Sequence, residues 1–299
     1  MRTPVYVVGT DLSARSKAAL AAAAELAQRT GAEVHVLCAV HPDLVRADAE
    51  FAERVRSSSA ALLRRAGLPQ AVTRVVASAD PAATLANHAR AVSADLVAVA
   101  PRGRSAWRRA LLGSVTERLL RTVPGALLIV RGPLPPAGGI ALVAIDMTPG
   151  SARAFRTALD LARRLHLRLV ALHVVRPAWS TLALDADMFD TREQTRESER
   201  VAEADGRFRK FVAGFDTSGV DVAVQLAEGH AVDAVLREGR TVGARLLIVG
   251  SHGKTAAHEL FVGSVAHGVA THANVSVLVV RARPPARGGG KARRRTARS

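Results

Sequence analysis

The sequence has 299 residues, of which 48% are hydrophobic and 23% are charged, and this length is typical of two globular domains. Its single cysteine, Cys38, excludes an intramolecular disulfide and a zinc site built from several cysteines. No apolar run reaches the roughly 18 residues that a membrane helix requires, and the first residues read as a strand rather than as a signal peptide. We therefore expect a cytoplasmic protein with no membrane segment.

The formal net charge of +16 is unevenly distributed along the chain. Residues 281–299 contribute eight positive charges and contain no acidic residue, which leaves about half of the excess for the rest of the chain. Aromatic residues make up only 3% of the sequence, so it lacks the platform on which successive bases stack in many nucleic-acid sites. A contact between the basic C-terminal segment and nucleic acid is therefore the weaker functional hypothesis.

Short apolar runs alternate with longer segments of helical periodicity along the chain. In the first half, strands are predicted over residues 5–9, 34–40, 72–76, 95–100 and 126–130, and a helix over residues 14–29. After a segment rich in proline and glycine, the second half has predicted strands over residues 140–145, 169–175, 220–226, 245–250 and 275–280, and a helix over residues 152–165. Continuous apolar strands separated by helices favour parallel sheets that are covered on both faces.

The two halves are copies of one unit. Residues 8–13 correspond to residues 143–148 at an offset of 135, and residues 113–131 correspond to residues 263–281 at an offset of 150. The second copy is therefore 15 residues longer, and the extra residues fall around residues 185–209. Charges of both signs in this stretch favour a solvated helix face or a loop.

These patterns predict an α/β fold with two tandem, Rossmann-like domains. Each domain is expected to be a doubly wound, five-stranded parallel sheet with the strand order 3-2-1-4-5. The first domain is predicted to span residues 1–132 and the second residues 140–283. Residues 133–139 form the linker between them, and residues 284–299 form a basic disordered tail.

The strand order places a binding crevice where the connections change direction, at the carboxyl ends of strands 1 and 4. Asp11 and Asp146 follow the first strand of their respective copies. After the fourth strand of the second copy, glycines and a Gly-Ser pair at the start of the next helix allow backbone amides to approach an anion closely. The sequence therefore predicts a phosphate site in this crevice.

The spacing Gly250-x2-Gly253-x9-Gly263-Ser264, with an aspartate ending the first strand, resembles the ATP-binding signature of the universal stress protein family. The resemblance covers nearly the whole chain as two tandem copies. It implies a stress-response regulator whose interactions with protein partners depend on bound ATP, with Mg²⁺ as an open question. In the second domain it implies contacts to the nucleotide from Ile145, Asp146, Val174, Val249, Gly250, Gly253, Gly263, Ser264 and Val265.

The first domain departs from this pattern. The corresponding residues are Thr10, Asp11, Gly103, Gly113, Ser114 and Val115. Ala100 stands in place of the first glycine, where a methyl group would obstruct backbone approach if the position needs a positive φ, and Pro101 removes a backbone donor. Nucleotide binding by the first domain is left open, and a nucleotide-independent interaction scaffold is the alternative function.

Other chemistries have less support. Gly253-Lys254-Thr255 lacks the earlier glycine of a P-loop, because that position is Ile248. Ser114 and Ser264 do not lie in a nucleophile elbow and are predicted as helix-capping serines that touch phosphate. No catalytic or metal-binding residue is identified, so at most slow ATP hydrolysis is expected. Cys38 is predicted to be a core residue.

The resemblance also implies how the copies pack. By analogy with dimers of single-domain relatives, the edge strands over residues 126–130 and 275–280 would pair around a pseudo-twofold axis and satisfy each other's backbone groups. Whether two chains form a homodimer, and which proteins are the partners, is left open.

Overall fold

The computed structural model describes residues 2–43, 50–65, 67–68, 70–101, 112–176, 191–251 and 262–281. The first copy contains the following elements in chain order: β1 (Val5–Gly9), α1 (Ala14–Thr30), β2 (Glu33–Val40), α3 (Phe51–Arg65), β3 (Val72–Ala77), α4 (Pro81–Ala91), β4 (Leu96–Val99), α5 (Ser114–Thr122) and β5 (Ala126–Ile129). The second contains β6 (Ile140–Ala144), α6 (Pro149–Leu165), β7 (Arg168–Val175), α7 (Thr191–Ala213), β8 (Val222–Glu228), α8 (Ala231–Thr241), β9 (Leu246–Gly250), α9 (Ser264–His272) and β10 (Ser276–Val280).

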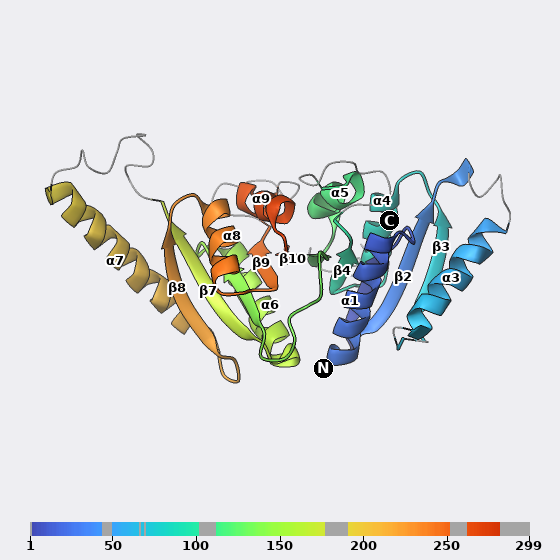
Figure 1. Cartoon of the computed structure of the whole chain (residues 1–299), viewed down its shortest axis with the longest axis horizontal. Helices are drawn as coiled ribbons and strands as arrows, with labels where there is room; N and C mark the ends of the chain where they lie inside the picture. Colours follow the sequence, from blue (N-terminus) through green and yellow to red (C-terminus); the bar gives the residue numbers. More distant parts are fainter. Residues whose placement is uncertain are drawn as a thin grey trace, which may run out of the picture.

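The ten strands form one continuous sheet with the order β3-β2-β1-β4-β5-β10-β9-β6-β7-β8. Each copy keeps the predicted order 3-2-1-4-5, and all pairings within a copy are parallel. The copies join through the antiparallel pair β5–β10, in which Leu128 lies opposite Leu278. Figure 1 shows the two halves side by side, with α3 and α7 at the outer ends. The expected pairing of the two edge strands is confirmed.

Helices cover both faces of the sheet because the strands are apolar on both sides. One face packs against α1, α3, α6 and α7, with Leu20, Leu63, Phe155 and Phe208 in the core. The opposite face packs against α4, α5, α8 and α9. Successive residues of β1 alternate between the two cores, since Val7 belongs to the second and Val8 to the first. Both cores run across the boundary between the copies, so the domains share their hydrophobic interior.

Two arginines brace the junction in a reciprocal way. Arg131, after β5, donates to the carbonyl oxygen of Ala270 in α9, and Arg281, after β10, donates to the carbonyl oxygen of Leu120 in α5. Donor and acceptor positions are both related by the offset of 150 residues. Each guanidinium thus satisfies carbonyl groups near the end of a helix in the other copy, where the helix dipole favours a cation.

A second pair of equivalent positions meets near the pseudo-twofold axis. The imidazole Nε2 of His267 in α9 lies 3.1 Å from the carboxylate Oε1 of Glu117 in α5. Two identical copies would place two glutamates or two histidines opposite each other here. The tandem chain instead places one of each, and these two side chains can pair.

The longer second copy differs from the first in its outer helix. Helix α7 has 23 residues, whereas α3 has 15. The mixed-charge stretch lies partly in α7, where Arg200 pairs with Glu197 and Arg209 with Asp205. The solvated helix face is therefore the correct alternative for this part, and residues 185–190 lie outside the described ranges. Phe208 anchors α7 with a fully buried ring.

Two simpler predictions can be compared directly with the structure. Cys38 is 3% exposed and packs beside Val40 and Val55, as expected of a core residue. Within the described ranges, none of the helices combines the length and the apolar character that a membrane crossing demands. The basic tail over residues 284–299 lies outside the described residues.

Candidate functional site

The second copy has a cleft at the carboxyl ends of β6, β7 and β9, beside the start of α9. Its volume is about 250 Å³. Every described residue that the sequence predicted for this domain lines it, namely Ile145, Asp146, Val174, Val249, Gly250, Gly263, Ser264 and Val265. Gly253 lies outside the described residues. The parallel strands thus gather residues from four separate segments at the point where the sheet order reverses.

The turn after β6 holds Asp146 in a constrained geometry. Met147 adopts φ 60°, a left-handed conformation that is unfavourable for a residue with a side chain. The carboxylate Oδ1 of Asp146 accepts a hydrogen bond from the backbone N–H of Thr148 at 3.1 Å and another from its hydroxyl. Thr148 in turn caps α6 by accepting from the N–H of Ser151. The turn therefore fixes the Asp146 carboxylate at the wall of the cleft.

The same turn is found after β1 in the first copy. Leu12 adopts φ 58°, and the carboxylate Oδ1 of Asp11 accepts from the backbone N–H of Ser13 at 3.0 Å. Ser13 caps α1 by accepting from the N–H of Ser16. Because both copies keep a strained residue next to an aspartate, the strain belongs to the repeated unit rather than to one loop.

Helix α9 begins at the cleft without a capping side chain. Its N-cap is Gly263, which makes no side-chain hydrogen bond to the first turn, and α5 begins in the same way at Gly113. Ser114 and Ser264 are exposed first residues of their helices rather than caps, so the prediction of capping serines is wrong. Glycine at this position leaves the first amide groups of the helix available to an anion.

Close backbone packing, rather than its φ, favours glycine at position 250. It is not among the glycines with positive φ in the described chain. A Cβ at this position would instead lie 3.1 Å from the carbonyl carbon and oxygen of Gly150, in the first turn of α6. The condition under which Ala100 would be obstructed, a positive φ at the equivalent position, is therefore not met. Ala100 is accommodated as a buried residue, 8% exposed.

His173 is a cleft residue that the sequence analysis missed. It is 9% exposed, and its Nδ1 lies 2.6 Å from the carbonyl oxygen of Ile145. Because a carbonyl oxygen only accepts, Nδ1 carries a proton and donates this hydrogen bond. The available signal was a polar residue inside the apolar run Leu169–Val175; the first copy has Cys38 at this position.

The cleft of the first copy is smaller, with a volume of about 130 Å³. Thr10, Asp11 and Val115 line it, whereas Gly113 and Ser114 lie at the start of α5 and do not, and Gly103 is outside the described residues. The lining explains the difference in size: Pro81 and Leu85 replace Ala231 and Val235 of the second copy.

Comparisons with known proteins agree with this architecture. The universal stress protein family model matches residues 5–131 and 139–281. A universal stress protein of Mycolicibacterium smegmatis is 34% identical over 194 residues, which are 64% of this chain and 63% of that protein. One from Bacillus subtilis is 30% identical over 145 residues, or 47% of this chain and 97% of that protein. The match to the mycobacterial relative thus spans slightly less than two thirds of its length.

A solved structure reproduces the tandem arrangement. The crystal structure of a universal stress protein from Archaeoglobus fulgidus superposes with a TM-score of 0.69 at 22% identity, covering 93% of this chain and 96% of that one. Fold and cleft together define a tandem α/β protein whose candidate ligand sites lie at the switch points of one shared sheet. The chain belongs to the universal stress protein family.

Proposed function

We propose that the second domain binds an adenine nucleotide, with ATP as the expected ligand. The observation that carries this proposal is the convergence of the predicted residues on one cleft beside an uncapped helix N-terminus. The polar groups of the cleft suit such a ligand, because a fixed carboxylate can accept hydrogen bonds from ribose or base and helix amides can donate to phosphate.

Each wall of the cleft supports a different part of this ligand. Ile145 and Val174 offer apolar surface to the base, and Asp146 accepts hydrogen bonds from the nucleoside. Gly250 keeps side-chain atoms away from the place where β9 and α6 approach one another. Gly263 leaves the start of α9 open to the phosphates, whose negative charge the helix dipole favours.

We infer that the protein acts as a regulator in stress responses by binding the nucleotide rather than by rapid turnover. In the described part of the cleft, Asp146 is the only carboxylate, and it is already engaged by Thr148. No group of three or more metal-binding side chains lies in the described ranges, so Mg²⁺, where it takes part, would be bound mainly by the phosphates. Occupancy of the cleft would then alter the surface that protein partners meet.

The small cleft of the first domain favours a second role for that half of the chain. The space beside α4 has about half the volume of its counterpart, and the adjoining hollow that shares Asp11 and Ala39 lies towards α3; this division of the space favours a nucleotide-independent interaction scaffold over a second nucleotide site. The basic tail, with a contact to nucleic acid, remains a separate and weaker hypothesis.

Calorimetric titration of the full chain with ATP tests the proposal. We expect saturable binding, and we expect Gly263→Ala to leave some affinity because alanine disturbs only the cap. Absence of measurable heat up to millimolar ATP would overturn the proposal. Purification without added nucleotide, followed by chromatography of the acid-released ligand, gives an independent readout.

A further inference from the structure

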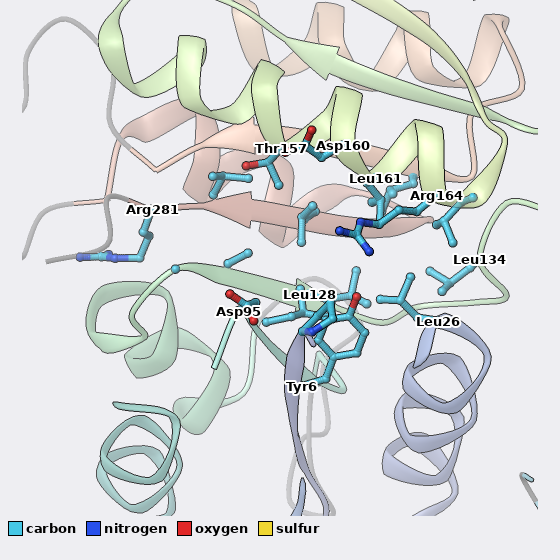
Figure 2. Close-up of a pocket in the computed structure, with 18 of the residues that line it drawn as sticks. Tyr6, Leu26, Asp95, Leu128, Leu134, Thr157, Asp160, Leu161, Arg164 and Arg281 are labelled. Carbon is cyan, nitrogen blue, oxygen red and sulfur yellow. The ribbon is translucent and has the colours of Figure 1, made fainter. Parts of the chain in front are cut away.

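A larger cavity lies between the two copies, away from both clefts. Its volume is about 470 Å³, within the range typical of small-molecule sites. Figure 2 shows it between α6 on one side and α1 on the other, above the paired strands β5 and β10. The clefts lie at the carboxyl ends of the strands. This cavity lies near the opposite ends of β1, β4 and β9, where Pro4, Leu96 and Leu246 line it.

The body of the cavity is apolar. Leu128 and Leu278 from the paired strands form its floor, and Leu26 and Leu161 contribute from the two helices. Tyr6 adds an aromatic ring, and its hydroxyl donates to the Thr30 side chain at 3.0 Å. Burial raises the pKa of the Tyr6 phenol, so it is neutral at physiological pH. These surfaces favour a chain or ring of hydrocarbon.

The rim carries two arginines for which the described residues supply no ion-pair partner. Arg2 forms an ion pair with Asp95 at 2.7 Å, and Asp160 lies 3.4 Å from Arg163. Arg153 and Arg164 also line the cavity, and no hydrogen bond or ion pair is found for either within the described ranges. Figure 2 shows the Arg164 side chain extending from α6 towards the space above Tyr6 and Leu128.

The equivalent arginine of the first copy shows that this exposure is not a general feature of the fold. Arg29 lies 135 positions before Arg164. Its guanidinium donates to the carbonyl oxygens of Pro135 and Leu165 and pairs with Glu25. Arg29 thus connects α1 to the linker and to the end of α6. Arg164 makes no such contacts with the described residues, and its side chain extends towards the cavity.

We propose that this interdomain cavity binds an amphiphilic anion, in which a carboxylate or phosphate is attached to an apolar chain or ring. Arg164 and Arg153 would hold the charged group, and the floor would hold the apolar part. Guanidinium groups form strong, geometrically defined hydrogen bonds with both kinds of anion. The chain's own tail is a poor occupant, because residues 282–299 are basic and contain no acidic residue.

Titration of the full chain with decanoate and with decyl phosphate tests this proposal, with 1-decanol as the neutral control. We expect at least one anion to bind saturably, and about tenfold more tightly than the alcohol, because a hydrogen bond to a charged group contributes at least that factor. The tighter anion identifies the head group. Equal binding of the alcohol, or no binding of either anion, would overturn the proposal.

Variants place the ligand within the molecule. Arg164→Gln should weaken binding about tenfold, whereas Arg156→Gln, on the same helix but outside the cavity and over the Phe215 ring, should leave it unchanged. Thr157→Trp should block the cavity from its rim. Asp146→Ala should have no effect, which separates this site from the proposed nucleotide cleft. Equal losses in the two arginine variants, or loss of binding in Asp146→Ala, would contradict the assignment.

Discussion

The two clefts of this chain come from the same repeated unit but differ in volume. Both copies place an aspartate after the first strand, follow it with a left-handed residue and begin the last helix at an uncapped glycine. They differ in volume, about 130 Å³ against about 250 Å³. The wall formed by the third helix of the unit, α4 or α8, carries the bulkier side chains in the smaller cleft. A retained motif therefore does not by itself fix the volume of the cleft, because neighbouring side chains decide how much room remains.

The first test exchanges the residues at the end of the fourth strand. Gly250→Ala should destabilise the protein by about 1–3 kcal/mol, since its methyl group meets the backbone of Gly150 and overpacks the first turn of α6. Ala100→Gly should cost less, about 0.5–1 kcal/mol, through the added freedom of the unfolded chain. Urea unfolding measures both changes.

Gly206→Ala supplies the control for this exchange. Gly206 lies inside α7, and a Cβ there would meet nothing within 4 Å. We expect a gain of roughly 0.5–1 kcal/mol, because alanine is the better helix former. A rise in stability for Gly250→Ala as well would show that the start of α6 yields to the methyl group, and would remove the packing argument.

A second test exchanges the wall residues. Val235→Leu adds a methylene group to the larger cleft and should weaken ATP binding about tenfold, the usual minimum for one group of this size in a fitted pocket. Leu85→Val enlarges the smaller cleft and should leave the binding stoichiometry unchanged, because Pro81 still narrows it. Equilibrium dialysis measures both effects. Unchanged affinity in Val235→Leu would show that the ligand does not reach this wall.

The smallest expected effect concerns the start of the wall helix. Asp80 caps α4 through the N–H of Ala83 and pairs with Arg118, and these interactions hold the pKa of its carboxyl below the ordinary value. Its counterpart in α8 is His230, which makes no capping hydrogen bond.

Because the folded-state pKa of Asp80 is lowered, its stabilising contribution is present above the ordinary carboxyl pKa of about 3.9 and is lost as the pH falls below that value. Asp80→Asn should therefore flatten the acid dependence of unfolding slightly, and His230→Asp should steepen it. Urea midpoints at pH 3 and pH 6 measure the change, and an unaltered profile in Asp80→Asn would contradict this role.

The sequence predicted the fold because the repeated pattern has a direct structural meaning. Apolar runs such as Val5–Gly9 are buried on both faces, and the edge runs around Leu128 and Leu278 could only satisfy their backbone groups by pairing. The aspartates and glycines also indicated the right edge of the sheet. These features depend on local spacing, which a sequence displays.

The remaining features depend on contacts between distant residues. That Leu85 narrows one cleft and Val235 leaves more room in the other follows from how α4 and α8 lie against the strands. In the sequence, His173 is indistinguishable from any other polar residue in a strand. Only the structure shows that its Nδ1 bonds to the carbonyl oxygen of Ile145. Arg29 and Arg164 are equivalent in sequence, but the linker and the end of α6 give Arg29 partners for which Arg164 has no counterpart among the described residues.

The stoichiometry of ATP binding tests the unequal clefts most directly. Calorimetry on the full chain should give one site per chain. Asp146→Ala should abolish it or weaken it at least about tenfold, the usual minimum for losing a hydrogen bond to a charged group, and Asp11→Ala should leave it unchanged. Two sites per chain, or a loss of binding in Asp11→Ala with Asp146→Ala unaffected, would contradict the proposal that the second cleft alone holds the nucleotide.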